Sequence, residues 1–78
     1  MKKDKYKIQI GDVMFEASKM YNKVIQHTIL EIYFEQYVSG YKTVVVTESY
    51  LGRHTKFASD VCNWYDSMNE AEEALNKR

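Results

Sequence analysis

Apolar and polar residues alternate along the middle of the chain, from about Thr28 to Tyr50, and the alternation breaks at Ser39-Gly40. A period of two is the pattern of a β-strand whose two faces meet different surroundings. The stretch therefore predicts two antiparallel strands, 28–38 and 41–50, joined by a tight turn. The face expected to point to the core carries Leu30, Ile32, Phe34, Val38, Val44 and Val46.

The turn decides the register of this hairpin. A two-residue loop at Ser39-Gly40 would place Glu31 opposite Glu48, where like charges repel each other. A three-residue loop with its glycine in the left-handed conformation pairs apolar residues on the core face instead. We expect this second register, whose outer face carries the pairs Glu31–Thr47, Tyr33–Val45, Glu35–Thr43 and Tyr37–Tyr41.

The segment before these strands is compatible with two structures. If Gly11-Asp12 is a two-residue turn, the flanking strands bring Lys7 opposite Glu16 on one face and leave apolar pairs on the other. A helix over 12–25 also fits, because apolar residues recur there along one stripe. We expect the hairpin, since both of its faces pair well, and residues 19–26 then form a connection.

The last element predicted is a helix over 59–76. Ser59 is a good N-cap, and a short edge strand over 53–57 precedes it. An apolar stripe at three- and four-residue steps would cover the sheet, and it consists of Val61, Trp64, Tyr65, Met68, Ala71 and Leu75. On this interpretation Trp64 and Tyr65 belong to the core rather than to a ligand site.

These elements predict one small α+β domain that spans residues 1–78. The expected fold is an antiparallel β-sheet of four to five strands with the C-terminal helix packed on one face. If residues 12–25 are helical, the order becomes β-α-β-β-α. A chain of 78 residues buries only a modest share of its surface, so we expect a thin stability margin and no deep active-site cleft.

Composition excludes several classes of function. Eleven Lys and Arg residues balance eleven Asp and Glu residues, so no general electrostatic attraction to nucleic acid or to an anionic membrane follows. Cys62 is the single cysteine and cannot form an internal disulfide, and the N-terminus lacks the apolar region of a signal peptide. No apolar run is longer than three residues, as in the three valines of 44–46. We expect a cytoplasmic protein, in a bacterium or an infected host cell, without a membrane partner.

Three residues could bind a transition metal or act as base and nucleophile: His27, His54 and Cys62. They are scattered singly, without CxxC, HxxxH or HExxH spacing. The glycines are isolated turn residues with no phosphate-binding pattern around them. The sequence therefore predicts no catalytic, metal or cofactor site, and a protein that is not an enzyme.

Two charged segments could contact a partner. At the N-terminus Tyr6 is interleaved with Lys2, Lys3, Lys5 and Lys7, the minimum for binding single-stranded nucleic acid, and this is the alternative function. Such lysines more often protect a strand edge, so direct nucleic-acid binding is not our main expectation. The acidic residues of the helix could imitate a phosphate backbone but fit a solvated face better: Asp60, Asp66, Glu70, Glu72 and Glu73.

The outer face of the 28–38 and 41–50 hairpin carries tyrosines where solvent is expected. They could serve only to stabilise the sheet, or could be covered by the 19–26 connection. A sheet backed by one helix instead leaves this face open, as an aromatic patch with a charged rim. We interpret the face as a partner-binding surface made of Glu31, Tyr33, Glu35, Tyr37, Tyr41, Lys42 and Val45.

In layout the chain resembles the small phage-encoded inhibitors of host defence, notably the anti-CRISPR proteins. The resemblance covers roughly residues 29–68, where the hairpin "ILEIYFEQYVSGYKTVVVTES" is followed by "FASDVCNWYDSM". It implies a small, rigid, non-catalytic domain that blocks a functional surface of a larger host protein or ribonucleoprotein complex. A phage or mobile-element inhibitor or regulator is therefore the expected function, with a homodimer through the tyrosine face as a further possibility.

Overall fold

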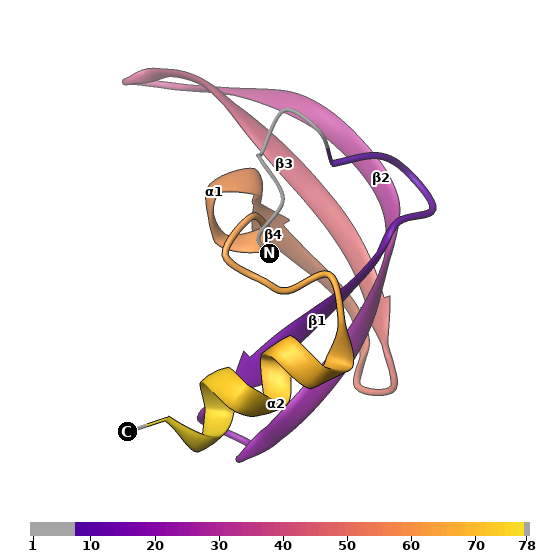
Figure 1. Ribbon diagram of the computed structural model, residues 1–78. Coiled ribbons are helices and arrows are strands. Elements are labelled where there is room, and N and C mark those ends of the chain that lie inside the picture. Colours follow the sequence, from indigo (N-terminus) through magenta and orange to yellow (C-terminus); the bar gives the residue numbers. More distant parts are fainter. Residues whose placement is uncertain (1–7, 78) are drawn as a thin grey trace.

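The computed structural model describes residues 8–77 and shows a four-stranded antiparallel sheet in the order β1-β2-β3-β4, with two helices after it (Figure 1). The elements are β1 (Val13–Ser18), β2 (Lys23–Tyr37), β3 (Gly40–Ser49), β4 (Gly52–Phe57), α1 (Ala58–Val61) and α2 (Met68–Asn76). The long strands β2 and β3 curve around the two helices (Figure 1). The predicted α+β class, an antiparallel sheet with a C-terminal helix, is confirmed.

β1 forms a hairpin with the first part of β2, in a register that sets Met14 opposite His27. The turn spans 19–22, and Asn22 supplies the left-handed backbone that closes it, with a φ of 54°. β2 begins at Lys23, so residues 23–26, which were expected to belong to a connection, are part of this strand.

This hairpin corrects the expectations for the N-terminal segment. Residues 8–12 form no strand beside β1; they form a turn in which the N–H of Asp12 donates to the carbonyl of Gln9 (3.1 Å). The alternative helix over 12–25 is also wrong, because the alternation of β2 continues upstream and gives β1 an apolar partner strand. The residues of the alternative nucleic-acid site lie outside the described residues: Lys2, Lys3, Lys5, Tyr6 and Lys7.

A two-residue turn, Val38-Ser39, joins β2 to β3 in place of the expected three-residue loop. The register is shifted by one residue, so that Ile32 lies opposite Val45 and Glu35 lies opposite Lys42. Residues of opposite charge thus occupy facing positions on the two strands, whereas the expected register sets Glu35 against a threonine. The attraction favours the observed pairing.

A shift of one residue exchanges the two faces of a strand. Beyond residue 30, β2 keeps its expected faces, but before it Ile29 takes the core position expected for Leu30. The faces of β3 are exchanged: Val45 points into the core, and Val44 and Val46 point to the opposite side. A bulge between Ile29 and Glu31 changes the register of β2 against β3 by one residue at this point. The face toward the helices is the inner face below, and the opposite face is the outer face.

The predicted helix over 59–76 is in fact two helices, separated by residues 62–67. α1 has no side-chain cap, so Ser59 is not the N-cap expected. α2 begins after Ser67, whose hydroxyl accepts a hydrogen bond from the N–H of Glu70 (3.2 Å). This Ser-x-x-Glu pattern is a capping box, which starts a new helix.

The backbone of Tyr65 explains the interruption. Its N–H and C=O exchange hydrogen bonds of 2.8 and 2.9 Å with Phe15, at the outer edge of β1. These groups cannot bond within a helix at the same time, so the chain is extended at this point. The free edge of β1 is covered as a result.

The hydrophobic core lies between the inner face and the helices. Its buried cluster consists of Ile8, Met14, Ile29, Val45, Ala58, Val61 and Trp64. Trp64 is a core residue, as expected, although it lies in the loop before α2. Three residues expected in the core, Phe34, Val38 and Met68, are exposed.

Candidate functional site

The end of the β2–β3 hairpin extends beyond the rest of the sheet, and we refer to residues 31–43 as the hairpin arm. β1 pairs with β2 only up to Thr28, and β4 pairs with β3 only from Val44. Within residues 8–77, neither edge of the hairpin arm therefore has a partner strand. Its tip projects past α1 at the upper left of Figure 1.

The outer face of the hairpin arm carries most of the partner-binding surface expected from the sequence. The residues brought together there are Glu31, Tyr33, Glu35, Tyr37 and Lys42. Tyr41 and Val45 are not among them, because the shifted register turns both to the inner face. Val45 is fully buried and cannot contact a partner in this fold, whereas Tyr41 is exposed.

Contacts within the molecule already engage part of the outer face. The rings of Tyr37 and Phe57 meet edge to face with their centroids 5.8 Å apart. The Nζ atom of Lys42 lies 5.5 Å and 5.1 Å from these two centroids, and Val44 is only 2 % exposed. A side-chain hydrogen bond with Glu35 raises the pKa of Tyr37. These contacts stabilise the sheet, so the sheet-stabilising interpretation accounts for part of this face.

The inner face of the hairpin arm is more open. Phe34 is 74 % exposed and Tyr41 is 73 % exposed, and Val38 stands free at the turn. A cleft of about 450 Å³ runs between these rings and the start of α1 at Ala58. Sequence reasoning placed Phe34 in the core because it assumed a long helix above it. The capping box at Ser67 is the signal in the sequence that a new helix begins there, so no single long helix covers Phe34.

A second candidate site lies on the inner face near β1, where two histidines that look scattered in the sequence meet. His27 Nε2 lies 2.8 Å from Glu16 Oε1, and His27 Nδ1 lies 3.2 Å from Thr47 Oγ1. Trp64 stacks on the His27 ring, with centroids 4.0 Å apart and planes 19° apart. The ring of His54 approaches edge-on, at a centroid distance of 6.1 Å. Only the strand register brings these residues together, so spacing in the sequence does not reveal the cluster.

Burial lowers the pKa of His27 below its ordinary value, and this effect outweighs the hydrogen bond and the charge of Glu16. A neutral imidazole has one donor and one acceptor nitrogen. Because a carboxylate only accepts, Nε2 donates to Glu16, and Nδ1 then accepts from the hydroxyl of Thr47. The two partners therefore fix one tautomer of the ring.

A carboxylate, an imidazole and a hydroxyl in series can activate a nucleophile. Here, however, Thr47 is fully buried and His27 is 2 % exposed, so a substrate cannot reach the hydroxyl in this fold. The hydrogen bonds instead connect β1, β2 and β3 beneath Trp64. We assign the cluster to the core.

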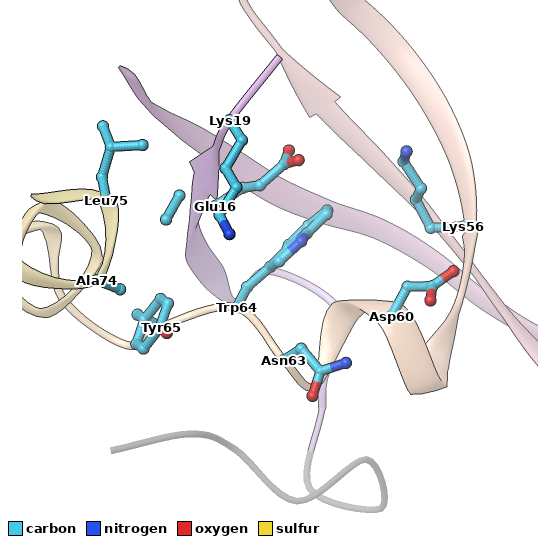
Figure 2. A pocket seen from close by; sticks show the side chains of 10 residues that line it. Glu16, Lys19, Lys56, Asp60, Asn63, Trp64, Tyr65, Ala74 and Leu75 are labelled. Atoms are coloured by element: carbon cyan, nitrogen blue, oxygen red, sulfur yellow. The ribbon is translucent and has the colours of Figure 1, made fainter. Parts of the chain in front are cut away.

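A cavity of about 550 Å³ lies beside this cluster, between β1, α1 and α2. Figure 2 shows the side chains that line it. Glu16 and Trp64 form part of its wall. The rest combines charged side chains of both signs, including Lys56 and Asp60, with uncharged ones such as Leu75. The volume is in the range of small-molecule sites. No group of three His, Cys, Asp or Glu residues within 8–77 is placed to hold a metal ion. The Sγ atom of Cys62 lies 3.2 Å from the carbonyl oxygen of Ser59.

Two further results complete this description. No helix in the described part of the chain has the length and apolar character needed to cross a membrane. The chain matches no protein-family model, and the comparisons with curated proteins and with solved structures give no match.

Proposed function

We propose that the protein is a non-catalytic binding protein whose hairpin arm contacts a partner protein. The observation that carries this proposal is the exposure of Phe34 and Tyr41, at 74 % and 73 %, on an arm that projects from the body. Large exposed rings that lie close together are typical of interaction surfaces. Tyrosine and phenylalanine bury much area on binding and lose little side-chain entropy.

The construction of the hairpin arm also favours binding. Its strands are paired without interruption from Glu31–Val46 to the turn at Val38-Ser39, so the arm is largely ordered before it meets a partner. A preformed surface avoids part of the entropy loss of association. A specific interface needs about 800 Å² on each partner, which the two faces of an arm inserted into a groove can supply.

The biological role that we propose is inhibition by stoichiometric contact. In this role a phage or mobile element encodes the protein, and the hairpin arm covers a functional surface of a host protein or ribonucleoprotein complex, such as a defence complex. A small body behind a projecting arm supports this proposal, because it allows a chain of 78 residues to fill a groove on a larger partner.

Affinity capture from an extract of the native host tests the proposal. The parent protein should retain a specific partner, and the double variant Phe34→Ala with Tyr41→Ala should lose it, with a loss in purified binding of about 2 kcal/mol or more. The matched control is Met20→Ala with Tyr50→Ala, which removes two side chains of similar exposure, 86 % and 62 %, at the other end of the sheet.

Thermal melts of all three proteins show whether the variants remain folded. The control should bind like the parent. If the Phe34 and Tyr41 variant is folded and retains the partner at parental affinity, the hairpin arm is not the binding surface.

A further inference from the structure

The hairpin arm has an open strand edge on the side of β2. The closing pair Tyr37–Gly40 directs the backbone groups of Tyr37 toward β3, and the direction alternates from residue to residue along an antiparallel ladder. The N–H and C=O groups of Ile32, Phe34 and Gln36 therefore point to the open side. No described residue forms a backbone hydrogen bond with them.

Within residues 8–77, the edges of β1 and β4 are protected, whereas the edge of β2 along the hairpin arm is not. Tyr65 covers β1 at Phe15, and the exposed edge of β4 carries Arg53 and Lys56. Lysine, arginine and covering segments are the usual protection of an edge. The open edge of β2, over 31–37, has no proline and no basic residue. An unprotected edge of this length is suited to receive another strand.

The charges along this edge indicate which strand it receives. Glu31 and Glu35 are both exposed, lie four residues apart and share the outer face with Tyr33 between them. The Nζ atom of Lys42, opposite Glu35, lies over the rings of Tyr37 and Phe57. Glu35 already accepts a hydrogen bond from Tyr37. The carboxylate of Glu31 and the remaining acceptor positions of Glu35 can face cationic side chains on an added strand.

A second copy of the chain is a poor occupant. Two β2 edges related by a two-fold axis bring the same carboxylates together: with Ile32 opposite Phe34, Glu31 faces Glu35. With Phe34 opposite its own copy, the two Glu35 side chains are diagonal neighbours. Like charges in these positions destabilise strand pairing.

We propose that the open edge of β2 binds an extended segment of a partner protein as an added antiparallel strand, with Lys or Arg at two positions four residues apart and apolar residues between them. The two cations face Glu31 and Glu35, and the apolar residues meet Tyr33 on the outer face and Phe34 on the inner face. This inference rests on the proposed function and specifies the chemistry of the partner.

A synthetic peptide, Thr-Lys-Val-Val-Val-Lys-Thr, tests the inference with the folded full-length protein. It should bind and slow amide hydrogen exchange at Ile32, Phe34 and Gln36. The same peptide with glutamate in place of lysine should bind at least about tenfold more weakly. In the variant Glu31→Lys with Glu35→Lys this preference should be reversed.

A backbone test separates strand addition from simple charge attraction. Gln36→Pro removes an N–H group that points to the open edge, where proline is tolerated, and should abolish binding of the lysine peptide. Gln36→Ala is the matched control and should bind like the parent. Thermal melts of the two variants establish that both are folded.

Equal binding of the lysine and glutamate peptides, or unchanged hydrogen exchange at the three amides, would overturn strand addition. The proposed function would survive that result if the native partner still depends on Phe34 and Tyr41. If the native partner is lost in Gln36→Pro and retained in Gln36→Ala, strand addition is supported for that partner as well.

Discussion

His27 is a buried polar residue whose hydrogen bonds reach two neighbouring strands. Nε2 bonds to Glu16 on β1 and Nδ1 to Thr47 on β3, so the ring links three strands. A buried polar group without partners costs about 1–3 kcal/mol. A slip of β1 by one residue would turn Glu16 away and leave Nε2 unpaired. The histidine therefore helps to specify the strand register.

The lowered pKa of His27 makes the stability of the fold depend on pH. Because burial lowers this pKa, the unfolded chain takes up a proton more readily than the folded one. The free energy of unfolding should be highest above the ordinary histidine pKa of 6.5 and fall as the pH drops below it, until the folded pKa is passed.

Urea unfolding between about pH 5.5 and 8 measures this dependence, above the range where ordinary carboxyl groups titrate. The variant His27→Gln keeps a polar side chain and should be less stable, with a flatter pH profile. Glu16, His54 and Lys56 are the charged or titratable groups that act on His27, and they remain in the variant. A parent protein equally stable at both ends of the range would contradict the prediction.

Thr47→Val tests the same cluster without changing a charge. The substitution removes the hydroxyl that donates to Nδ1 of His27 and keeps the size of the side chain. Denaturant unfolding at neutral pH should show a loss of about 1–3 kcal/mol, because the ring nitrogen stays buried without a partner. Thr55→Val, at an exposed position of β4, is the control and should change the unfolding free energy little.

At the scale of elements, the position of the helix start is testable. Ser67→Ala removes the hydroxyl that accepts from the N–H of Glu70 and should cost about 1 kcal/mol. In a chain of this size that corresponds to a decrease in Tm of about 4–8 °C. Ser59→Ala is the matched control, because α1 has no side-chain cap. A larger effect at Ser59 than at Ser67 would contradict the two-helix arrangement.

The elements that alternation alone determines were predictable from the sequence. The strands around residues 28–38 and 41–50, the α+β class and the core position of Trp64 follow from local pattern. The partner of β1 was not predictable in this way, because the segments before and after it both offer apolar faces. The cap at Ser67 is a local signal, and the prediction of one long helix gave more weight to the apolar stripe that continues across it.

The candidate surface was harder to predict than the elements, because it depends on a single step of register. Closing the hairpin with the two-residue turn Val38-Ser39 instead of the expected three-residue loop moves Tyr41 and Val45 to the other face. Both turns are compatible with the local residues. The choice depends on cross-strand pairs such as Glu35–Lys42, together with burial of Val45, and these are properties of the assembled sheet.

At the scale of the whole molecule, an open edge and a formal net charge of zero both favour self-association. Glu31 and Glu35 oppose it, because paired β2 edges bring these carboxylates together. We expect a monomer at neutral pH in sedimentation velocity. The homodimer expected through the tyrosine face cannot use Tyr37 and Tyr41 together, since they lie on opposite faces.

Neutralising the two carboxylates should release this association. The variant Glu31→Gln with Glu35→Gln should form dimers or larger species at concentrations where the parent is monomeric. Glu72→Gln with Glu73→Gln changes the net charge equally, at exposed positions of α2, and should remain monomeric. Equal association of the two variants would indicate a general charge effect rather than pairing at the β2 edge.

The stacking of Trp64 on His27 gives the molecule an optical reporter of its own. Trp64 is the only tryptophan in the chain, and it is 7 % exposed. An indole out of water fluoresces at shorter wavelength than one in water, so emission from this one ring reports whether the loop before α2 is closed over the sheet. A protonated imidazole in contact with an indole quenches its emission. The intensity of the folded protein should therefore follow the charge of His27, while the wavelength follows the packing of the core.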